Sequence, residues 1–365
     1  NTSGTSNFTA GVNAGNSITS GGNFNVVVGD EAGTALTTGD QNVAVGYQAL
    51  DALDTAIRNV AVGTTALTSD TKGDASVAVG HGALFTQNFT TTTSVYNVAV
   101  GYHAGVNVTT GQQNTLIGGE AGDAFTDADF NVGLGYRALS TDTLGSKSVA
   151  VGNGSLFAQN FTTATDSFNT AVGFEAGVSV TTGVLNTLVG GLTGLALTSG
   201  NNNTAVGYAA LSTDTLGDRN VAIGIQALGA QNFTTSTDSY NVAVGYDSGR
   251  NVSTGVRNTL VGGLAGDALT TGDNNAVLGF NALGSDTQGD RNVAIGSAAL
   301  FAQNFTTTTD SYNVAVGYEA GVSVTTGKQN TIVGGLAADA VTTGTNNVAV
   351  GYLALSTETA ADNSV

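Results

Sequence analysis

The stretch Asn42-Val43-Ala44-Val45-Gly46-Tyr47-Gln48-Ala49-Leu50 decides the fold, because the rest of the chain repeats it with small changes. Gly46 and its counterparts are named zero glycines. The others are Gly29, Gly63, Gly80, Gly101, Gly118, Gly135, Gly152, Gly173, Gly190, Gly207, Gly224, Gly245, Gly262, Gly279, Gly296, Gly317, Gly334 and Gly351. A 17-residue step separates successive zero glycines, except before Gly101, Gly173, Gly245 and Gly317, where the step is 21. Three steps of 17 and one of 21 make a 72-residue super-repeat. A period this short predicts a solenoid, in which each repeat is one coil stacked on its neighbours.

The composition fits a chain of short strands and tight turns. The 365 residues include 53 glycines and no proline, cysteine, methionine or tryptophan. Proline cannot donate to a ladder of backbone hydrogen bonds, so its absence favours strands, and the absence of cysteine excludes disulfides and thiolate metal sites. A net charge of -18 argues against nucleic acid and anionic membranes as partners. No apolar run is long enough to insert into a membrane.

The residues before each zero glycine alternate, which predicts a strand with two distinct faces. The residue just before the glycine is large and aliphatic, and the residue two before it is usually alanine. We expect the large residues, such as Val45, to point into the coil and the alanines, such as Ala44, to face outward. The glycine is expected to adopt a bend or a positive φ that a side chain would resist.

The rest of each coil is predicted to contain a second short strand and a polar turn such as Thr37-Thr38-Gly39-Asp40. Asparagine opens the first strand in most coils, which suits stacked side-chain ladders. The sequence thus predicts an irregular first coil at residues 1–24 and one solenoid domain of about 19 coils at residues 25–365. Because Asn363-Ser364-Val365 has the phase of a new coil, we interpret the chain as part of a longer fibre.

The frame Asn/Ser-Val-Ala-Val/Ile-Gly-x-x-Ala/Ser resembles the head repeats of trimeric autotransporter adhesins, the YadA-like heads. Ser148-Val149-Ala150-Val151-Gly152 has the motif in nearly its usual form. The resemblance covers the chain from about Asn25, although the coils here are longer than in those heads. It implies a left-handed parallel β-roll that associates as a homotrimer on a cell surface. Similar repeats occur in phage tail fibres, so a virion fibre shaft is the alternative.

A larger side chain replaces the outward alanine once in each super-repeat. These residues are Leu116, Leu188, Leu260 and Ile332. If they face outward, they add to an apolar stripe of the kind that marks interaction surfaces, and we expect self-association as a trimer or a filament. The alternative is that the coil is wide enough to bury both faces.

The 21-residue coils carry the sequence Asn-Phe-Thr, an acceptor pattern for N-glycosylation. The acceptor asparagines are Asn88, Asn160, Asn232 and Asn304. Chance occurrence in a chain rich in Asn and Thr is the alternative. The phenylalanines of these triplets are expected to anchor the loop on the coil.

Carboxylates also recur with the long period, and hard oxygen ligands in a turn are what Ca²⁺ prefers. The candidates are Asp142, Asp214, Asp218, Asp286 and Asp290. Their spacing lacks the dense aspartate pattern of calcium-binding repeats, so the prediction is no cofactor, with Ca²⁺ as the weaker alternative.

No nucleophile, base and orienting acid come together in the sequence. Hexad repeats of left-handed acyltransferases match only residues 45–50, and His81 and His103 have no counterparts in other super-repeats. An ice-binding array is disfavoured because threonine pairs such as Thr37-Thr38 are adjacent and must face opposite sides. The sequence therefore predicts a non-catalytic extracellular fibre or adhesin stalk that provides reach and rigidity and attaches to a host receptor, a surface or a glycan.

Overall fold

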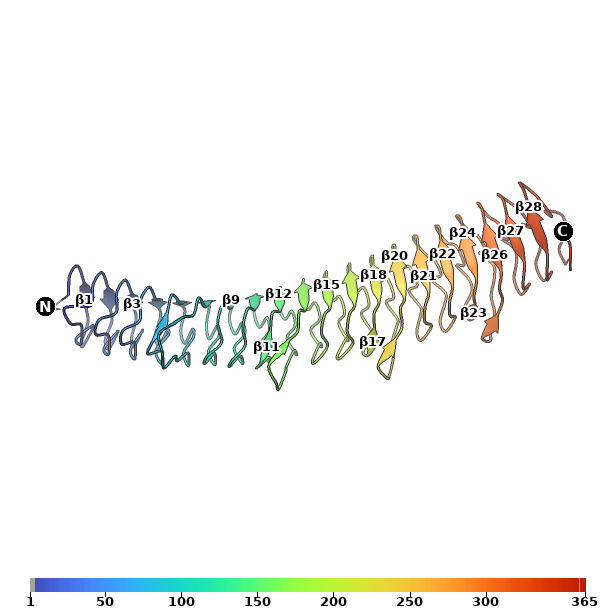
Figure 1. The fold of residues 1–365 in the computed structure, drawn as a ribbon. Coiled ribbons are helices and arrows are strands. Elements are labelled where there is room, and N and C mark those ends of the chain that lie inside the picture. The colour runs from blue at the N-terminus through green and yellow to red at the C-terminus, as the bar shows by residue number, and fades with distance from the viewer. Residues whose placement is uncertain (1–3, 361) are drawn as a thin grey trace. The chain divides into compact units, whose positions relative to one another are not determined.

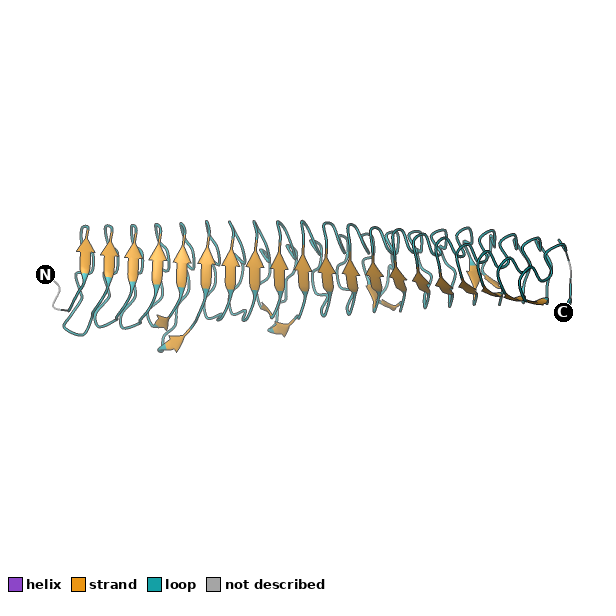
Figure 2. Cartoon of the chain, turned by 90° about the horizontal axis from the view of Figure 1, so that it is seen from above, coloured by secondary structure: helices purple, strands orange, loops and turns teal. Residues whose placement is uncertain are grey.

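The computed structural model describes residues 4–360 and 362–365, which form strands and turns and contain no helix (Figure 2). The chain divides into two compact units, Asn1–Thr182 and Gly183–Val365. In each unit, successive coils contribute three-residue strands that pair in parallel (Figure 1). The predicted all-β parallel solenoid is therefore confirmed.

The main strands of the first unit pair in chain order. They are β1 (Phe8–Ala10), β2 (Val26–Val28), β3 (Val43–Val45), β4 (Val60–Val62), β6 (Val77–Val79), β8 (Val98–Val100), β9 (Thr115–Ile117), β10 (Val132–Leu134), β12 (Val149–Val151) and β14 (Thr170–Val172). β1 pairs with β2 through Phe8 opposite Val26, a step one longer than that of the regular coils.

The main strands of the second unit follow the same rule. They are β15 (Thr187–Val189), β16 (Thr204–Val206), β18 (Val221–Ile223), β20 (Val242–Val244), β21 (Thr259–Val261), β22 (Ala276–Leu278), β24 (Val293–Ile295), β26 (Val314–Val316), β27 (Thr331–Val333) and β28 (Val348–Val350).

Each 21-residue coil keeps the main strand in register and places its extra residues elsewhere. β12 still pairs with β14 across the longer step, with Val149 opposite Thr170. Each 21-residue coil forms a two-residue strand away from the main strands, and this strand pairs with one in the 17-residue coil before it; β11, β17 and β23 of these preceding coils are labelled in Figure 1. The pairs are β5 (Gly73–Asp74) with β7 (Thr93–Ser94), β11 (Gly145–Ser146) with β13 (Thr165–Asp166), β17 (Gly217–Asp218) with β19 (Thr237–Asp238), and β23 (Gly289–Asp290) with β25 (Thr309–Asp310).

The zero glycines have the positive φ that the sequence predicts, between 127° and 147°. Space is the second reason for glycine at this position. A Cβ on Gly46 would lie 2.5 Å from the carbonyl oxygen of Gly63 in the next coil, well inside van der Waals contact. Only glycine therefore permits both the bend and the close approach of stacked coils.

The expected assignment of the two strand faces is wrong. Ala44, two before the zero glycine, is buried, whereas Val43 and Val45 on either side are half-exposed. The interior is already filled by other residues of the same coil, notably Ala49 and Leu50, which are also buried. The remaining space between strand and opposite wall admits a methyl group, so the larger residues of the strand point to the outside.

Larger residues occupy this inner position where the residues that face it across the coil are smaller. Leu260 replaces the inner alanine and is fully buried. The residues four after the zero glycine, which are leucine in many coils, are Gly249 and Gly266 here. A Cβ on Gly249 or Gly266 would lie 2.5 Å or 2.9 Å from the nearest Leu260 methyl carbon. Leu260 thus occupies volume that two leucines fill elsewhere.

The second strand expected in every coil occurs only in each 21-residue coil and in the 17-residue coil before it, as the two-residue strands described above, and the prediction is wrong for the other described coils. Turns occupy this part of the coil, and residues two and four after the zero glycine have positive φ even when they are not glycine, as at Gln48 and Leu50, both at 54°. Such conformations are uncommon for residues with a side chain. These conformations persist because the chain must turn inward within a few residues. The leucine four after the zero glycine, such as Leu50, is buried and packs in the core.

An asparagine ladder follows the start of the main strands. Asn59 donates its backbone N–H to Oδ1 of Asn42 over 2.9 Å, and its side-chain Nδ2 donates to the carbonyl of Gly73 over 2.8 Å. Both asparagines are fully buried. Each asparagine therefore satisfies groups in the preceding coil and its own coil, which is why a buried polar residue is tolerated here. Ser364 continues the ladder by donating its N–H to Oδ1 of Asn347 over 2.9 Å.

Candidate functional surfaces

The four residues predicted to form an outward self-association stripe are core residues. Leu116, Leu188, Leu260 and Ile332 are each 0% exposed. Their expected outward direction is wrong, and the alternative of internal burial holds. What faces outward on the main strands is a double column of mostly β-branched residues, one and three before each zero glycine, such as Val242 and Val244 of β20. The sequence did contain an apolar outer face, but on the opposite side of the strand.

Buried carboxylates hold the long coils. Asp142 accepts hydrogen bonds at Oδ1 from the backbone N–H of Gly145 over 3.0 Å and of Phe161 over 3.1 Å. Its Oδ2 accepts from Nε2 of Gln159 over 2.6 Å, and Oε1 of Gln159 accepts from Nδ2 of Asn169 over 2.9 Å. This Asp–Gln–Asn chain links the end of one coil to the long loop of the next and to the asparagine ladder. Its members recur once in each super-repeat.

The equivalent chains are built in the same way. Asp70 accepts from Gln87, Asp214 from Gln231 and Asp286 from Gln303, over 2.5 to 2.6 Å. Burial raises the pKa of Asp70, Asp142, Asp214 and Asp286 above its ordinary value of 3.8, while the hydrogen bonds from the glutamine and the backbone act in the opposite direction. The sequence signal for this arrangement was a glutamine one 17-residue step after each aspartate, and it was missed.

Asp218 and Asp290 have a separate role. Each accepts the backbone N–H of a residue in the preceding coil, from Asn201 over 2.6 Å and from Asp273 over 2.7 Å. Within the described part of the chain, no three carboxylates or histidines gather in a way that would hold a metal. Asp142, Asp214, Asp218, Asp286 and Asp290 all have N–H donors as neighbours, so the calcium prediction gains no support from their geometry.

The four acceptor asparagines of the long coils are accessible. Asn88, Asn160, Asn232 and Asn304 are exposed. Each accepts a hydrogen bond at Oδ1 from a threonine hydroxyl of the preceding coil, as from Thr71 to Asn88 over 3.0 Å. The phenylalanine that follows each asparagine is buried, at 5% to 6% exposed, which confirms that it anchors the loop. Glycosylation at these positions stays a prediction.

Cations lie over exposed rings at three of the long coils. The charged groups of Lys147, Arg219 and Arg291 lie 5.2 to 5.6 Å from the ring centroids of Phe168, Tyr240 and Tyr312. Each cation also forms an ion pair with an aspartate near the tip of the loop, at Asp166, Asp238 or Asp310. Such contacts on exposed groups stabilise weakly, and they explain how exposed rings are held against the coil.

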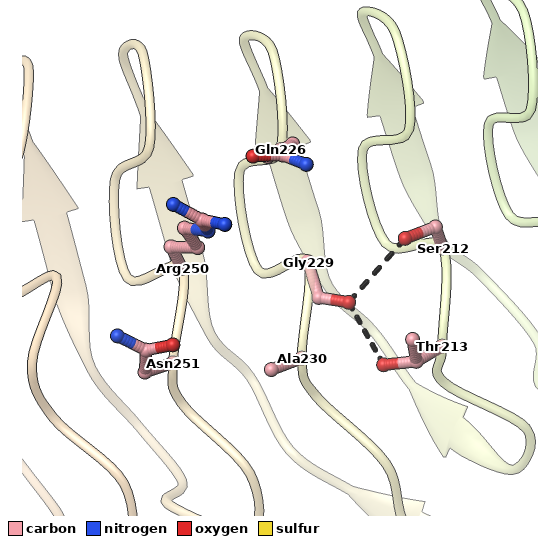
Figure 3. A pocket seen from close by; sticks show the side chains of 7 residues that line it. All are labelled: Ser212, Thr213, Gln226, Gly229, Ala230, Arg250 and Asn251. Carbon is pink, nitrogen blue, oxygen red and sulfur yellow. Dashed lines mark hydrogen bonds between the residues drawn. The ribbon is translucent and has the colours of Figure 1, made fainter.

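Several hollows on the surface are open to solvent. One in the second unit, with a volume of about 280 Å³, lies between neighbouring coils and is lined by Ser212, Thr213, Gln226, Gly229, Ala230, Arg250 and Asn251 (Figure 3). The hydroxyls of Ser212 and Thr213 both donate to the carbonyl of Gly229, over 3.4 and 2.8 Å. The lining of this hollow offers no nucleophile beside a base. His81 and His103 lie elsewhere, with ring centroids 5.3 Å apart.

The comparisons with known proteins assign no family. No family model matches the sequence, and no curated protein matches it significantly. Among the described residues there is also no helix of the length and apolarity needed to cross a bilayer.

Proposed function

We propose that this chain is a non-catalytic structural segment of an extracellular fibre or adhesin stalk, which provides reach and rigidity at a cell or virion surface. The β-solenoid fold is compatible with a structural role, and the resemblance to YadA-like heads favours the adhesin over the alternatives. A phage tail-fibre shaft belongs to the same class, and an ice-binding solenoid lies outside it.

The observation that carries this proposal is that the same contacts recur between each coil and the next. Within each unit, neighbouring coils are joined by parallel strand pairing, a zero glycine in close approach and an asparagine or serine at the ladder position. The interior of the coil is filled mostly by buried alanine and leucine side chains, which pack against one another. Such an array transmits load along its axis through many equivalent hydrogen bonds, and its length is set by the number of coils.

A deletion of one super-repeat tests the reach. Removal of residues 102–173 should shorten the particle by about 19 Å, since four coils at ~4.8 Å each are lost, and should leave its cross-section unchanged. Small-angle scattering of the purified chain and of the deletion variant measures both quantities. A compact particle, or a change in cross-section without a change in length, would contradict the proposal.

We further propose self-association through the outward columns of the main strands, in place of the buried leucines. Ile223 is 38% exposed and Leu278 is 50% exposed, so these apolar side chains are available to a second copy. Ile223→Asp with Leu278→Asp should reduce the sedimentation coefficient of an assembled trimer or filament to that of a monomer. Thr254→Asp, also at an exposed position, is the matched control that should leave assembly unchanged. An assembly that resists the double substitution would exclude this face.

A further inference from the structure

A row of exposed aromatic rings directly follows the zero glycines and is used by nothing described above. In the second unit the rings belong to Tyr208, Tyr246, Phe280, Tyr318 and Tyr352, and they are 55% to 73% exposed. The first unit has Tyr47, Tyr102, Tyr136 and Phe174 at the same position, 48% to 55% exposed. Exposed aromatic residues in a line are unusual on a soluble surface, because each forgoes the stabilisation of burial.

From Tyr102 onward a ring recurs at every second coil, whereas Tyr47 lies three coils before Tyr102. The positions between the rings in the second unit hold Ile225, Gly263, Ser297 and Gly335. Since equivalent residues of successive coils are in register, neighbouring rings of the row are about 9.6 Å apart, two steps of ~4.8 Å. The same alternation holds in the first unit from Tyr102 to Phe174, where Gly119 and Asn153 separate the three rings.

Glycines at several of the alternate positions leave space beside the rings. A Cβ on Gly263 would lie 3.6 Å from Cδ2 of Phe280, and one on Gly191 would lie 3.8 Å from Cδ2 of Tyr208. One edge of each of these rings therefore borders backbone, and no side chain stands between the ring and the glycine before it. A long ligand lying along the row would meet bare backbone between the rings at Gly191, Gly263 and Gly335, and a side chain at Ile225 and Ser297.

Planar polar side chains stand beside several of the rings. The residue after Phe280 is Asn281, the residue after Tyr318 is Glu319, and in the first unit Arg137 follows Tyr136. The three polar residues are half-buried and so keep an accessible part. Amide, carboxylate and guanidinium groups can each make two hydrogen bonds in one plane, which suits a ligand with hydroxyl pairs at its edges and apolar C–H faces above and below.

We propose that the aromatic row binds an extended β-1,4-linked glucan chain. In this polymer alternate sugars are turned over, so the same C–H face recurs once per disaccharide, a repeat close in length to two coils. The equatorial hydroxyls lie at the rim of each sugar, where the planar polar side chains can reach them. This proposal names a ligand to which the fibre would attach, and its biological setting rests on the proposed function.

Charge favours this ligand over nucleic acid, another polymer that stacks on aromatic rings. With a net charge of -18, the protein repels a polyanion, whereas a neutral glucan meets no such penalty. Multivalency then makes several weak contacts sufficient, because rings held at fixed spacing engage one chain together.

Binding of the whole chain to microcrystalline cellulose and to cellohexaose tests the inference. The triple variant Tyr246→Ala, Phe280→Ala, Tyr318→Ala should lose affinity for cellulose roughly a hundredfold, about fivefold per ring. The matched control is the double variant Tyr240→Ala, Tyr312→Ala, which removes rings of similar exposure (50% and 47%) outside the row and should bind as the parent does.

Spacing is tested by moving a ring without losing it. Phe280→Ser with Ser297→Phe keeps the composition and shifts one ring by a coil, and it should weaken cellohexaose binding about as much as Phe280→Ala. Maltohexaose, whose α-1,4 linkages curve the chain, should bind at least tenfold more weakly than cellohexaose. Equal affinity for the two sugars, an unaffected ring-shift variant or no cellulose binding by the parent would each overturn the proposal.

The same preparations separate this inference from the proposed function. If the triple variant loses oligomerisation in place of cellulose binding, the row is an interface between copies and the glucan proposal is wrong. An elongated particle in scattering that binds no glucan refutes the ligand alone, whereas a compact particle refutes the fibre role whatever it binds.

Discussion

Two kinds of coil end occur in the same super-repeat and differ in chemistry at one position, the seventh after the zero glycine. In apolar-ended coils this residue is Val108 or Phe125, and in polar-ended coils it is Asp142 or Gln159. All four are fully buried. The backbone of the main strand is the same in both, so the difference lies in what the end of the coil must hold.

The comparison explains where the extra residues of a long coil can be inserted. Asp142 accepts the N–H of Phe161, which belongs to the long loop, and Gln159 joins the loop to the asparagine ladder. A valine or phenylalanine at this position could accept neither bond. Polar ends therefore accompany the insertion, because the looped backbone brings donors that need buried acceptors.

The largest expected effect breaks an apolar-ended coil. Leu188→Ala removes a fully buried side chain and should cost about 3 kcal/mol, the usual range for a large-to-small change in a core. Hydrogen exchange of the amides of β15 and β16 measures the loss coil by coil, which is preferable to one global midpoint in a repeat protein.

A second substitution makes this result specific. Gly194 has a φ of 57°, close to the 52° of Leu211 at the equivalent place one coil later, and a Cβ there would lie 3.0 Å from Leu188 Cδ2. Gly194→Leu should thus destabilise the parent but restore part of the loss in Leu188→Ala. If both backgrounds respond alike, the proposed exchange of volume is wrong.

The next effect breaks a polar end. Asp286→Ala leaves Gln303 Nε2 and the N–H groups of Gly289 and Phe305 without their acceptor, and should cost about 2 kcal/mol. Faster hydrogen exchange confined to the long loop is the expected readout. Val252→Ala, at the corresponding apolar end, should leave that loop protected; loss of protection there as well would mean that the two ends do not act separately.

The pH dependence of stability should come from the polar ends. Burial raises the pKa of Asp70, Asp142, Asp214 and Asp286 above 3.8 in the folded chain. The folded state then binds protons more readily than the unfolded state, so the thermal midpoint should rise as the pH falls from 7 through the folded pKa, and level off below 3.8. Asp142→Asn should make the rise smaller by removing one of these groups, whereas Val108→Ala should only lower the whole curve. A midpoint that falls on acidification would contradict the assignment.

The smallest effect sharpens the comparison within the polar ends. Asn292 occupies the ladder position where the second super-repeat has Ser148, whose hydroxyl accepts from Gln159 over 2.8 Å. Asn292→Ser should cost no more than about 1 kcal/mol, since a serine already fits this environment. Asn275→Ser, in a coil without a glutamine at its end, should lower the free energy of unfolding by more, as measured by thermal melting. Equal losses for the two variants would mean that the glutamine does not compensate for the missing asparagine.

The sequence predicted the repeat and therefore the stacking of coils. Gly46 and its counterparts recur at a fixed spacing, because only glycine permits the positive φ and the close approach of coils at this position. The sequence did not predict the direction of the side chains. The alternation of large and small residues, as at Val45 and Ala44, is the same whichever of the two points inward. The volume already filled by Ala49 and Leu50 decides that the alanine points inward. The carboxylates were found by periodicity but interpreted in isolation, since their glutamine partners lie a whole coil away along the chain. The aromatic row was overlooked because Tyr246 and Phe280 differ in identity and are separated by a glycine coil.

The exchange of volume between Leu260 and the glycines Gly249 and Gly266 has an evolutionary consequence. A duplication or loss of a single coil would place a leucine against a leucine, or a glycine against an alanine, and would leave a clash or a void at the new junction. A duplication or loss of a whole super-repeat returns every coil to its former neighbours. Lineages that lengthen or shorten this protein should therefore do so by whole super-repeats, so that the heritable unit is four coils although the structural unit is one.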